Sequence, residues 1–292
     1  MSDWNKKLPL TVLLAAKNEA VNLPRCLETL TPAERVVVLD SHSTDTTAKI
    51  AERYCAEVVQ FTYAGGYPKK RQWALDCLAI ETPWVLLLDA DEVVPDALWD
   101  EISKALNDPC DECDAYLIKK GFHFLGRRFR YGGFSHSAVL LLRPGKGRFE
   151  CLFNDVASGL DMEVHERIVV QGRIGQLETP LVHEDFKGLE AYIARHNQYS
   201  TWEALLRYHY LKTGRYGEET VTPRLFGNAQ ERRRFLKALV IRLPFEPQIW
   251  FFYHFIFRLG FLEGRAGLIA CQIRASYIAQ TRAKLYELTK AE

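Results

Sequence analysis

The sequence lacks a net charge of either sign. Its 292 residues include 38 Lys and Arg against 37 Asp and Glu, which gives a formal net charge of +1. So small a net charge creates no strong overall field for nucleic acid or acidic ligands, and any electrostatic function has to be local. We therefore expect no nucleic-acid partner.

The sequence also lacks an internal repeat, a low-complexity tract and an apolar run long enough to cross a bilayer. The most apolar segment, 247–262, has 16 residues and contains His254 and Arg258, whereas a spanning helix needs about 20. The N-terminal apolar run contains Pro9 and ends at Ala16, which indicates a strand rather than a signal peptide. With 48% hydrophobic and 26% charged residues, the composition excludes disorder, collagen and coiled coil.

The seven cysteines are odd in number and show no repeating spacing. This usage indicates a reducing compartment. Cys110 and Cys113 form one CxxC motif, but a zinc site needs a second ligand pair at a workable spacing and none is evident. We interpret this stretch as an exposed turn, with metal or redox use as the alternative.

Short apolar runs alternate with helical spacing over the first 110 residues. Strands spaced by helices predict a parallel sheet, and near-continuous apolar strands predict a sheet that is covered on both faces. In such sheets the ligand binds beyond the carboxyl ends of the strands. The strands are expected at 10–15, 35–39, 56–61 and 84–88.

Polar side chains follow three of these strands. The main ones are Asn18 and Glu19 after the first strand, Asp40 after the second, and Asp89 and Asp91 after the fourth. We expect them to lie on one rim of the sheet. The tract from Ser43 to Asp45 also has the composition of a helix start, so both capping and ligand binding stay open for Ser43 and Thr44.

Asp89 and Asp91 leave an apolar strand at positions i and i+2. Two carboxylates so placed can face one divalent cation together, and oxygen ligands suit Mg²⁺ or Mn²⁺. Such a cation can bridge two phosphates and neutralise a diphosphate leaving group. The tripeptide is common by chance, and its position after the fourth strand is what favours a metal site.

From about residue 115 the pattern changes to short strands joined by glycines, which predicts a more antiparallel, loop-rich part and then a long helix. We therefore expect three regions, 1–110, 111–187 and 188–292. The later strands and the helix are expected at 115–120, 138–143, 167–170, 173–177, 180–183 and 189–211.

Four motifs occur in order between about residues 9 and 100: TVLLAAKNEA, VVVLDSHSTDTT, GYPKKRQWALDCL and VLLLDADEVV. This series resembles family 2 glycosyltransferases of the GT-A fold. The resemblance implies an α/β fold with a mostly parallel, Rossmann-like sheet, an antiparallel acceptor-side part and a helical C-terminal segment. It also implies a nucleotide-sugar donor, most simply a UDP-sugar.

The resemblance assigns the donor-binding residues. Asp40 should contact the uracil or other base, with Asn18 and Glu19 flanking the nucleoside. Lys69 and Arg71 occupy the basic helix start that approaches the base or the diphosphate in the family. Asp89 should face the ribose or the sugar, and Asp91 should hold Mg²⁺ or Mn²⁺.

The second half resembles the glycosyltransferases that extend lipopolysaccharide cores and related envelope polysaccharides, through segments such as MEVHERIVVQGRIGQL and PLVHEDFKGLEAYIARHNQYS. The resemblance makes Glu166 the catalytic carboxylate, although the family often has a Glu-Asp pair where this chain has His-Glu. It makes His183 a late metal ligand. The alternatives are that Glu166 pairs with an arginine and that His183 is a core histidine, with Glu184 and Asp185 as rivals for either role.

Two further segments suggest contacts with the acceptor or its surroundings. Arg127, Arg128 and Arg130 could grip an anionic acceptor or the donor through bidentate hydrogen bonds, or form a solvated loop. The aromatic run 247–262 follows a basic cluster, which favours an anionic membrane surface over a packed helical hairpin or a homo-oligomer interface. The cluster consists of Arg232, Arg233, Arg234, Lys237 and Arg242.

These features predict an inverting, metal-dependent glycosyltransferase at the cytoplasmic face of a bacterial inner membrane, with a lipid-linked glycan as acceptor. Inversion requires a base for the acceptor proton and charge stabilisation at the leaving diphosphate. One alternative is a sugar nucleotidyltransferase, but AAKNEA replaces the glycine-rich basic loop expected after its first strand. The other is a catalytically inactive membrane adaptor, against which the intact acidic residues argue.

Overall fold

A computed structural model describes residues 7–108, 112–152, 161, 163, 166–214, 225–226, 239 and 243–291. The chain forms two compact units. The sheet unit comprises Met1–Phe129, Phe134–Glu150 and Gly159–Leu189. The helical unit comprises Arg130–Gly133, Cys151–Ser158 and Glu190–Glu292.

The described part of the sheet unit contains one ten-stranded mixed sheet, ordered β3-β2-β1-β4-β8-β6-β12-β5, with β7 and β11 also paired to β6. Two more strands, β9 (Gly147–Phe149) and β10 (Ile168–Val170), form a separate antiparallel ribbon. The strands of the large sheet are β1 (Leu8–Ala16), β2 (Ala33–Asp40), β3 (Glu57–Gln60), β4 (Trp84–Asp89), β5 (Glu92–Val93), β6 (Cys113–Phe124), β7 (Arg127–Arg128), β8 (His136–Leu142), β11 (Arg173–Gln176) and β12 (Leu181–His183).

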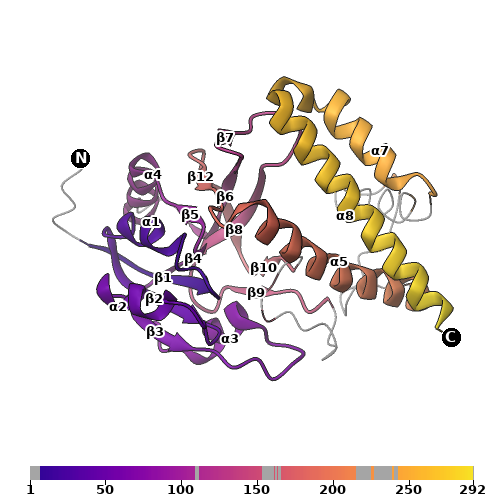
Figure 1. The fold of residues 1–292 in the computed structure, drawn as a ribbon. Helices are drawn as coiled ribbons and strands as arrows, with labels where there is room; N and C mark the ends of the chain where they lie inside the picture. Colours follow the sequence, from indigo (N-terminus) through magenta and orange to yellow (C-terminus); the bar gives the residue numbers. More distant parts are fainter. Residues whose placement is uncertain are drawn as a thin grey trace. The chain divides into compact units, whose positions relative to one another are not determined.

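The first four strands are parallel, as their alternation with helices predicts. β1 lies between β2 and β4 (Figure 1). In the register of the sheet, Asp40 is opposite Ala16, and Asp89 is opposite Ala15. The carboxyl ends of β1, β2 and β4 therefore lie side by side, which confirms the expected rim.

The later strands make the sheet mixed rather than simply antiparallel. β8 runs antiparallel to both β4 and β6, but β11 and β12 run parallel to β6. β5 pairs antiparallel with β12, with His183 opposite Glu92. This pairing carries the end of β12 to the turn that follows β4, where the sequence places Asp91.

The core of the sheet unit forms because its central strands are apolar on both faces. Val12, Leu14 and Leu88 are completely buried, and helices bury their own apolar residues on the sheet, such as Leu98 of α4. These helices are α1 (Leu23–Glu28), α2 (Thr47–Arg53), α3 (Lys70–Cys77) and α4 (Asp96–Asn107). An α/β fold with a largely parallel first half is therefore confirmed.

The helical unit contains most of α5 (Gly188–Thr213), then α7 (Glu246–Phe252), a π-helical turn η2 (Tyr253–Phe257), a 3₁₀ turn η3 (Gly260–Glu263) and α8 (Gly264–Lys290). The long helix expected at 189–211 is confirmed by α5. α7 lies alongside α8 (Figure 1). A buried charge network joins three helices, because Arg207 of α5 contacts Glu203 at 2.8 Å and Glu246 of α7 at 2.9 Å, while Arg282 of α8 contacts Glu246 at 3.1 Å.

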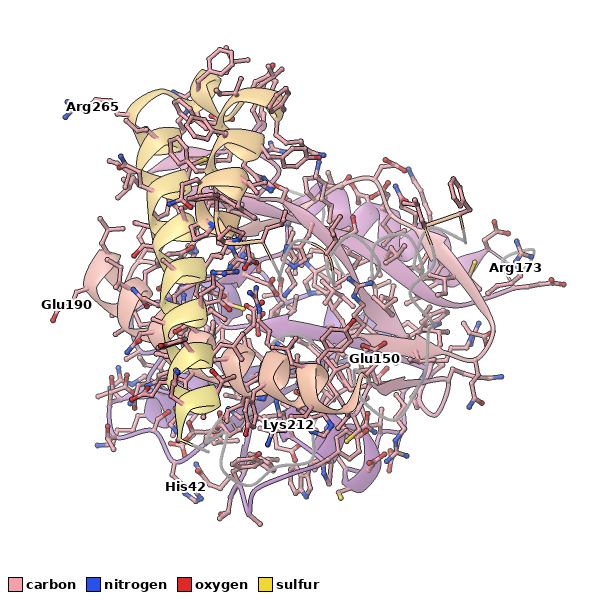
Figure 2. The ribbon with its side chains drawn as sticks, turned by 90° about the vertical axis from the view of Figure 1, so that its right-hand side faces the viewer. His42, Glu150, Arg173, Glu190, Lys212 and Arg265 are labelled. Carbon is pink, nitrogen blue, oxygen red and sulfur yellow. The ribbon has the colours of Figure 1, made fainter. Side chains whose placement is uncertain are left out.

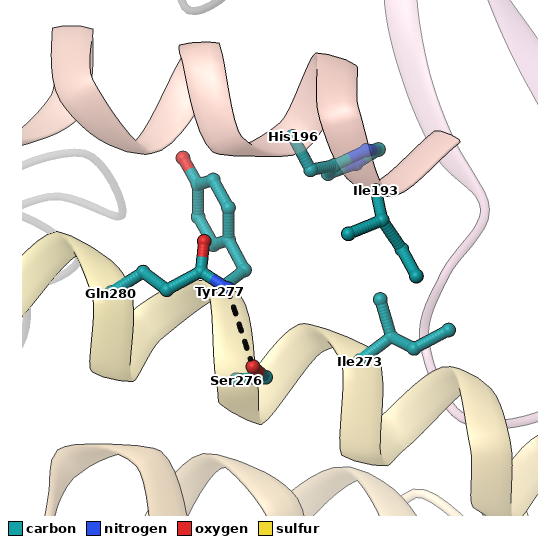
Figure 3. A pocket seen from close by; sticks show the side chains of 6 residues that line it. All are labelled: Ile193, His196, Ile273, Ser276, Tyr277 and Gln280. Carbon is teal, nitrogen blue, oxygen red and sulfur yellow. Dashed lines mark hydrogen bonds between the residues drawn. The ribbon is translucent and has the colours of Figure 1, made fainter. Parts of the chain in front are cut away.

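Within the described residues, no helix has the length and apolarity needed to span a membrane. A small pocket of about 60 Å³ lies between α5 and α8 (Figure 3). Its lining is mostly apolar, and its polar side chains include Ser276 and Gln280, which contact each other at 3.4 Å. The pocket lies in the helical unit and contains none of the residues that the sequence assigns to the donor site.

Candidate active site

The loops after β1 and β2 are tied together by hydrogen bonds. The Asn18 N–H donates to Ser43 Oγ at 2.8 Å, and the Thr44 N–H donates to Asn18 Oδ1 at 2.8 Å. Asn18 has a φ of 54°, a left-handed conformation that asparagine tolerates better than most residues. The two loops that are expected to flank a nucleoside are therefore held together by hydrogen bonds between Asn18 and residues 43 and 44.

Asp40 is buried at the end of β2 and organises the loop that follows it. Its carboxylate accepts the Ser43 N–H at 3.1 Å, the Ser43 hydroxyl, and the Gln60 amide at 3.0 Å. Ser43 does not cap α2. Asp45 accepts the N–H of Thr47, the first residue of α2, at 2.9 Å.

Glu19 connects the first loop to the chain after β12. Its carboxylate accepts hydrogen bonds from Lys187 Nζ at 2.5 Å and from Asn22 Nδ2 at 2.8 Å. Burial raises the pKa of Glu19, although the lysine opposes this. Asn22 also donates to Asp185 Oδ1 at 2.9 Å. Hydrogen bonds therefore link the loop after β1 to residues after β12 that are far away in the sequence.

The basic start of α3 lies inside the site, and Lys70 is its most buried residue. The Lys70 ammonium donates to the Ala16 carbonyl at 3.0 Å and lies 3.4 Å from Asp161 Oδ2. Burial lowers the pKa of Lys70. The sequence reasoning singled out its neighbours Lys69 and Arg71 but missed Lys70, which anchors α3 to the end of β1.

Glu163 caps the beginning of α3 from a distant part of the chain. Its carboxylate accepts the Arg71 N–H at 3.2 Å and the Gln72 N–H at 3.0 Å. Helix N-termini carry unpaired N–H groups and a positive dipole end, so a buried carboxylate is stabilising there. The segment that includes Asp161 and Glu163 thereby holds the basic helix start in place.

Asp89 belongs to a buried charge cluster. Its carboxylate pairs with Arg71 of α3 and with Lys120 of β6, the latter at 2.9 Å, and Lys120 also contacts Glu92 at 2.7 Å. Burial alone would raise the pKa of Asp89, but Arg71 and Lys120 outweigh it and hold the pKa far below its usual range. The Asp89 carboxylate is therefore ionised, and its two basic partners fix its orientation.

Lys120 was not predicted as a site residue. Burial would lower its pKa, but Asp89 and Glu92 raise it instead. The sequence did contain a signal, because side chains alternate along a strand and one of the adjacent lysines at the end of AYLIKK has to face inward. Lys119 is exposed, and Lys120 is buried.

Asp91 and His183, the two predicted metal ligands, lie side by side. His183 Nε2 is 3.3 Å from Asp91 Oδ2. Burial alone would lower the pKa of His183, but Asp91 raises it to about 9. The backbone supports the arrangement, because the Glu184 N–H donates to the Asp91 carbonyl at 3.0 Å.

A carboxylate beside an imidazole is a donor set that suits Mn²⁺ and is compatible with Mg²⁺. Among the described residues, no three His, Cys, Asp or Glu side chains gather into a complete cage. Mg²⁺ in phosphate-handling sites is typically bound by one or two protein ligands together with substrate phosphates and water. Asp91 and His183 therefore offer two protein ligands, a number that fits such a cation.

Glu166, the predicted base, lies against the start of α3. Its Oε1 is 2.6 Å from Lys69 Nζ, and the two side chains are only 3% and 4% exposed. The alternative to the role of base was that Glu166 pairs with an arginine, and the ion pair described here is with this lysine. Two residues assigned to different roles by the sequence therefore form one ion pair.

The rival carboxylates have other contacts. Glu184 Oε2 lies 3.3 Å from Arg25, whose guanidinium also stacks on the ring of Phe186 at 4.3 Å. Asp185 accepts the Lys187 N–H at 2.9 Å. Both are thus part of the turn that leads from β12 to α5.

The three arginines at 127–130 belong to two different units of the chain. Arg127 and Arg128 are exposed on β7, which pairs with β6, whereas Arg130 belongs to the helical unit. Cys113 is buried at the start of β6, which corrects the expected exposed turn at this position. Cys110 and the basic cluster at 232–242 lie outside the described residues.

The comparison that decides the family is a match of residues 11–153 to the sequence model of glycosyl transferase family 2. These residues are a family 2 glycosyltransferase domain. The match covers all four motifs, every predicted donor residue from Asn18 to Asp89, and the predicted metal ligand Asp91.

The chain has relatives that match nearly its whole length. It is 29% identical to the lipopolysaccharide core biosynthesis glycosyltransferase LpsC of Rhizobium meliloti, over 96% of this chain and 93% of the relative. An uncharacterized glycosyltransferase of Rickettsia bellii is 26% identical over 96% of this chain and 87% of the relative. A solved structure, the mannosyltransferase PcManGT of Pyrobaculum calidifontis with GDP-Man and Mn²⁺, is 16% identical and covers 97% of this chain and 88% of its own, with a TM-score of 0.49.

Proposed function

We propose that the protein is an inverting, metal-dependent glycosyltransferase that uses a nucleotide-sugar, expected to be a UDP-sugar. One observation carries the proposal: the Asp91–His183 pair, 3.3 Å apart, lies beyond the carboxyl ends of parallel strands, next to a cluster of buried basic groups. Ligands of open α/β sheets bind at that place. The arrangement suits a nucleoside diphosphate and a divalent cation together.

The donor is assigned to the loops after β1, β2 and β4. Asn18, Glu19 and Asp40 belong to the two interlocked loops that would flank the nucleoside. The ion pair with Asp89 orients the Arg71 guanidinium. Together with Lys69, Arg71 would supply positive charge near the diphosphate. Asp89 would face the ribose or the sugar.

Asp91 and His183 would hold Mg²⁺ or Mn²⁺. When bound, the cation would offset the negative charge that develops on the departing diphosphate. The imidazole has to be neutral to act as a ligand, and its pKa of about 9 means that metal binding would release a proton. Water and diphosphate oxygens would complete the coordination.

Glu166 is proposed as the general base. It would take the proton of the acceptor hydroxyl as that oxygen attacks the anomeric carbon opposite to the leaving diphosphate, so the glycosidic bond forms as the sugar–phosphate bond breaks. The contact with Lys69 at 2.6 Å holds the carboxylate in place at the start of α3. The contact also has to loosen when the acceptor enters.

The acceptor is proposed to be a lipid-linked glycan of bacterial lipopolysaccharide or another envelope polysaccharide. The support is the relative LpsC, which matches nearly the full length and is described as a lipopolysaccharide core biosynthesis enzyme. An acceptor of this kind would require the protein to work at the membrane surface, as a peripheral protein on the cytoplasmic face of the inner membrane. Exposed Arg127 and Arg128 could contact anionic groups on it.

A thermal-shift panel of nucleotide-sugars with Mn²⁺, Mg²⁺ or EDTA tests the proposal, because a ligand that binds only the folded state raises its apparent stability. We expect one nucleotide-sugar to raise the melting temperature in the presence of a cation and to be hydrolysed slowly. Release of pyrophosphate from a nucleoside triphosphate and a sugar phosphate would identify a nucleotidyltransferase instead. Failure of every donor to bind would favour the inactive adaptor.

A further inference from the structure

The end of the helical hairpin formed by α7 and α8 exposes an unusual number of large apolar side chains. Seven of them lie between residues 252 and 262 and are 42% to 75% exposed. We call these residues the apolar tip: Phe252, Tyr253, Ile256, Phe257, Leu259, Phe261 and Leu262. Large apolar patches on a soluble protein often mark a surface that binds a partner or a membrane, and seven exposed apolar side chains within eleven consecutive residues are a candidate for such a surface.

The apolar tip is a corner and not a continuous helix. α7 ends at Phe252, the π-helical turn follows, and Leu259 adopts a left-handed conformation with a φ of 60°. Gly260 then lies so close to the turn that a Cβ there would be 2.7 Å from the His254 carbonyl oxygen. The reversal places side chains that are adjacent in sequence on the outside of the bend.

Polar groups hold the corner from the inside. Buried Glu263 accepts the N–H groups of Arg130 at 2.6 Å and Tyr131 at 2.8 Å. The Gly132 N–H donates to the Arg258 carbonyl at 2.8 Å, and the Gly132 carbonyl lies 2.7 Å from His254 Nδ1. These contacts fix the shape of the tip without burying its apolar side chains.

All charged residues but one in the stretch 247–286 are positive. Glu263 is the only acidic residue between positions 247 and 286, and it is buried. Arg258 and Arg265 are exposed, and Figure 2 shows Arg265 pointing away from the ribbon near the start of α8. Within this described stretch, the tip therefore presents apolar side chains and positive charge and no exposed carboxylate.

We propose that the apolar tip inserts into the headgroup region of an anionic lipid bilayer, with Arg258 and Arg265 at the lipid phosphates. Aromatic side chains with neighbouring basic residues favour that boundary. The inference deepens the proposed membrane-surface location, and it replaces a helix lying flat with a corner that inserts. A second copy of the chain fits less well, because a symmetric contact through the tip would bring like charges together.

Co-sedimentation with phosphatidylcholine vesicles, with and without phosphatidylglycerol, tests the inference on the full chain. Wild type should bind the anionic vesicles, and the double variant F257S/F261S should bind them at least about tenfold more weakly, since each side chain loses a favourable transfer from water. The matched control is Tyr286→Ser, which removes a 64% exposed aromatic side chain from the other end of α8. It should bind as wild type does.

A second pair of measurements separates charge from insertion. Arg265→Gln should weaken binding to anionic vesicles but not to neutral ones. The fluorescence of Phe257→Trp should shift to the blue on vesicle binding, whereas that of Tyr286→Trp should not. Thermal unfolding should stay cooperative in every variant, and only F257S/F261S should lose some stability, because Phe261 packs edge-on against Phe255.

Vesicle binding that ignores F257S/F261S would overturn the inference, as would a wild-type chain that does not bind anionic vesicles. A wild-type dimer that F257S/F261S converts to a monomer would assign the tip to a second copy instead. None of these results depends on the donor site. Nucleotide-sugar binding, measured on the same samples, reports separately on the proposed glycosyl transfer.

Discussion

The rim of the sheet unit and the apolar tip of the helical unit are built in opposite ways. At the rim, charged groups converge and pair with one another, as Lys120 does with Asp89 and Glu92. At the tip, the single carboxylate, Glu263, points inward to backbone N–H groups, and the apolar side chains remain outside. In both regions buried polar contacts fix the shape. The groups that remain available for a ligand differ, because those at the rim are polar and suit the proposed nucleotide, whereas those at the tip are apolar and suit the proposed lipid.

The largest effect is expected from neutralising a buried carboxylate of the sheet unit. Glu166→Gln should lower turnover by about 10²–10⁴-fold, since that is the usual cost of a missing general base, while nucleotide-sugar affinity should change little. Steady-state kinetics and calorimetry measure the two effects. Glu112→Gln, the same change at an exposed carboxylate that pairs with Arg173, is the control. Full activity in Glu166→Gln would transfer the role of base to Glu184 or Asp185.

Removing the cation that joins two buried carboxylates should destabilise the sheet unit. Lys120→Met leaves Asp89 and completely buried Glu92 without their shared partner, and breaking such a pair costs about 3 kcal/mol. Urea unfolding measures the loss, and Lys120→Arg should recover part of it. The matched control is Lys119→Met on the exposed face of the same strand. If Lys119→Met and Lys120→Met were equally stable, the charge cluster would not support the rim.

The shape of the tip should depend on Gly260. A methyl group there would meet the His254 carbonyl at 2.7 Å and the Phe255 Cα at 3.2 Å, so Gly260→Ala should cost about 1–3 kcal/mol through overpacking and weaken vesicle binding. Gly126→Ala is not a fair control because its φ is 71°. Gly264 also has a positive φ, of 63°, so Gly264→Ala would be strained as well. Gly260→Ala is therefore compared with wild type at the same protein concentration. Unaltered unfolding and vesicle binding in Gly260→Ala would show that the corner is not tightly packed.

The smallest effect is expected from the inward carboxylate of the tip. Glu263→Gln keeps an oxygen for the two N–H groups but removes the charge, which should cost about 1 kcal/mol. Turnover of a soluble donor should not change, in contrast to Glu166→Gln. A large kinetic effect in Glu263→Gln would mean that the two regions do not have the separate roles assigned to them.

Much of the fold could be predicted because β1, β2 and β4 are almost entirely apolar and end in polar residues. The neighbourhood of Asp91 and His183 came from a family resemblance, since nothing in local spacing brings residues 92 positions apart together. Lys70 and Glu163 were missed for the same reason, because their partners are distant in the sequence. From the sequence alone, a lysine between two basic neighbours is expected to be exposed to solvent. Lys120 was predictable in principle, because strand alternation turns one of two adjacent lysines inward.

The tip was predicted only in part. The run 247–262 could be identified as apolar and too short to span a bilayer, but its left-handed bend falls on Leu259, a residue type that gives no signal for that conformation. The pairing of Glu263 with the distant residues Arg130 and Tyr131 is also a long-range contact. Both features depend on tertiary structure rather than on local sequence.

The central claim is that Asp91 and His183 bind a divalent cation together with the donor diphosphate. Isothermal titration calorimetry of UDP, with Mn²⁺ and with EDTA, tests it on wild type, Asp91→Asn and His183→Asn. The account predicts tight binding by wild type only with Mn²⁺, and weak, cation-independent binding by both variants. Equal UDP affinity in Mn²⁺ and EDTA, together with unchanged affinity in Asp91→Asn, would contradict it.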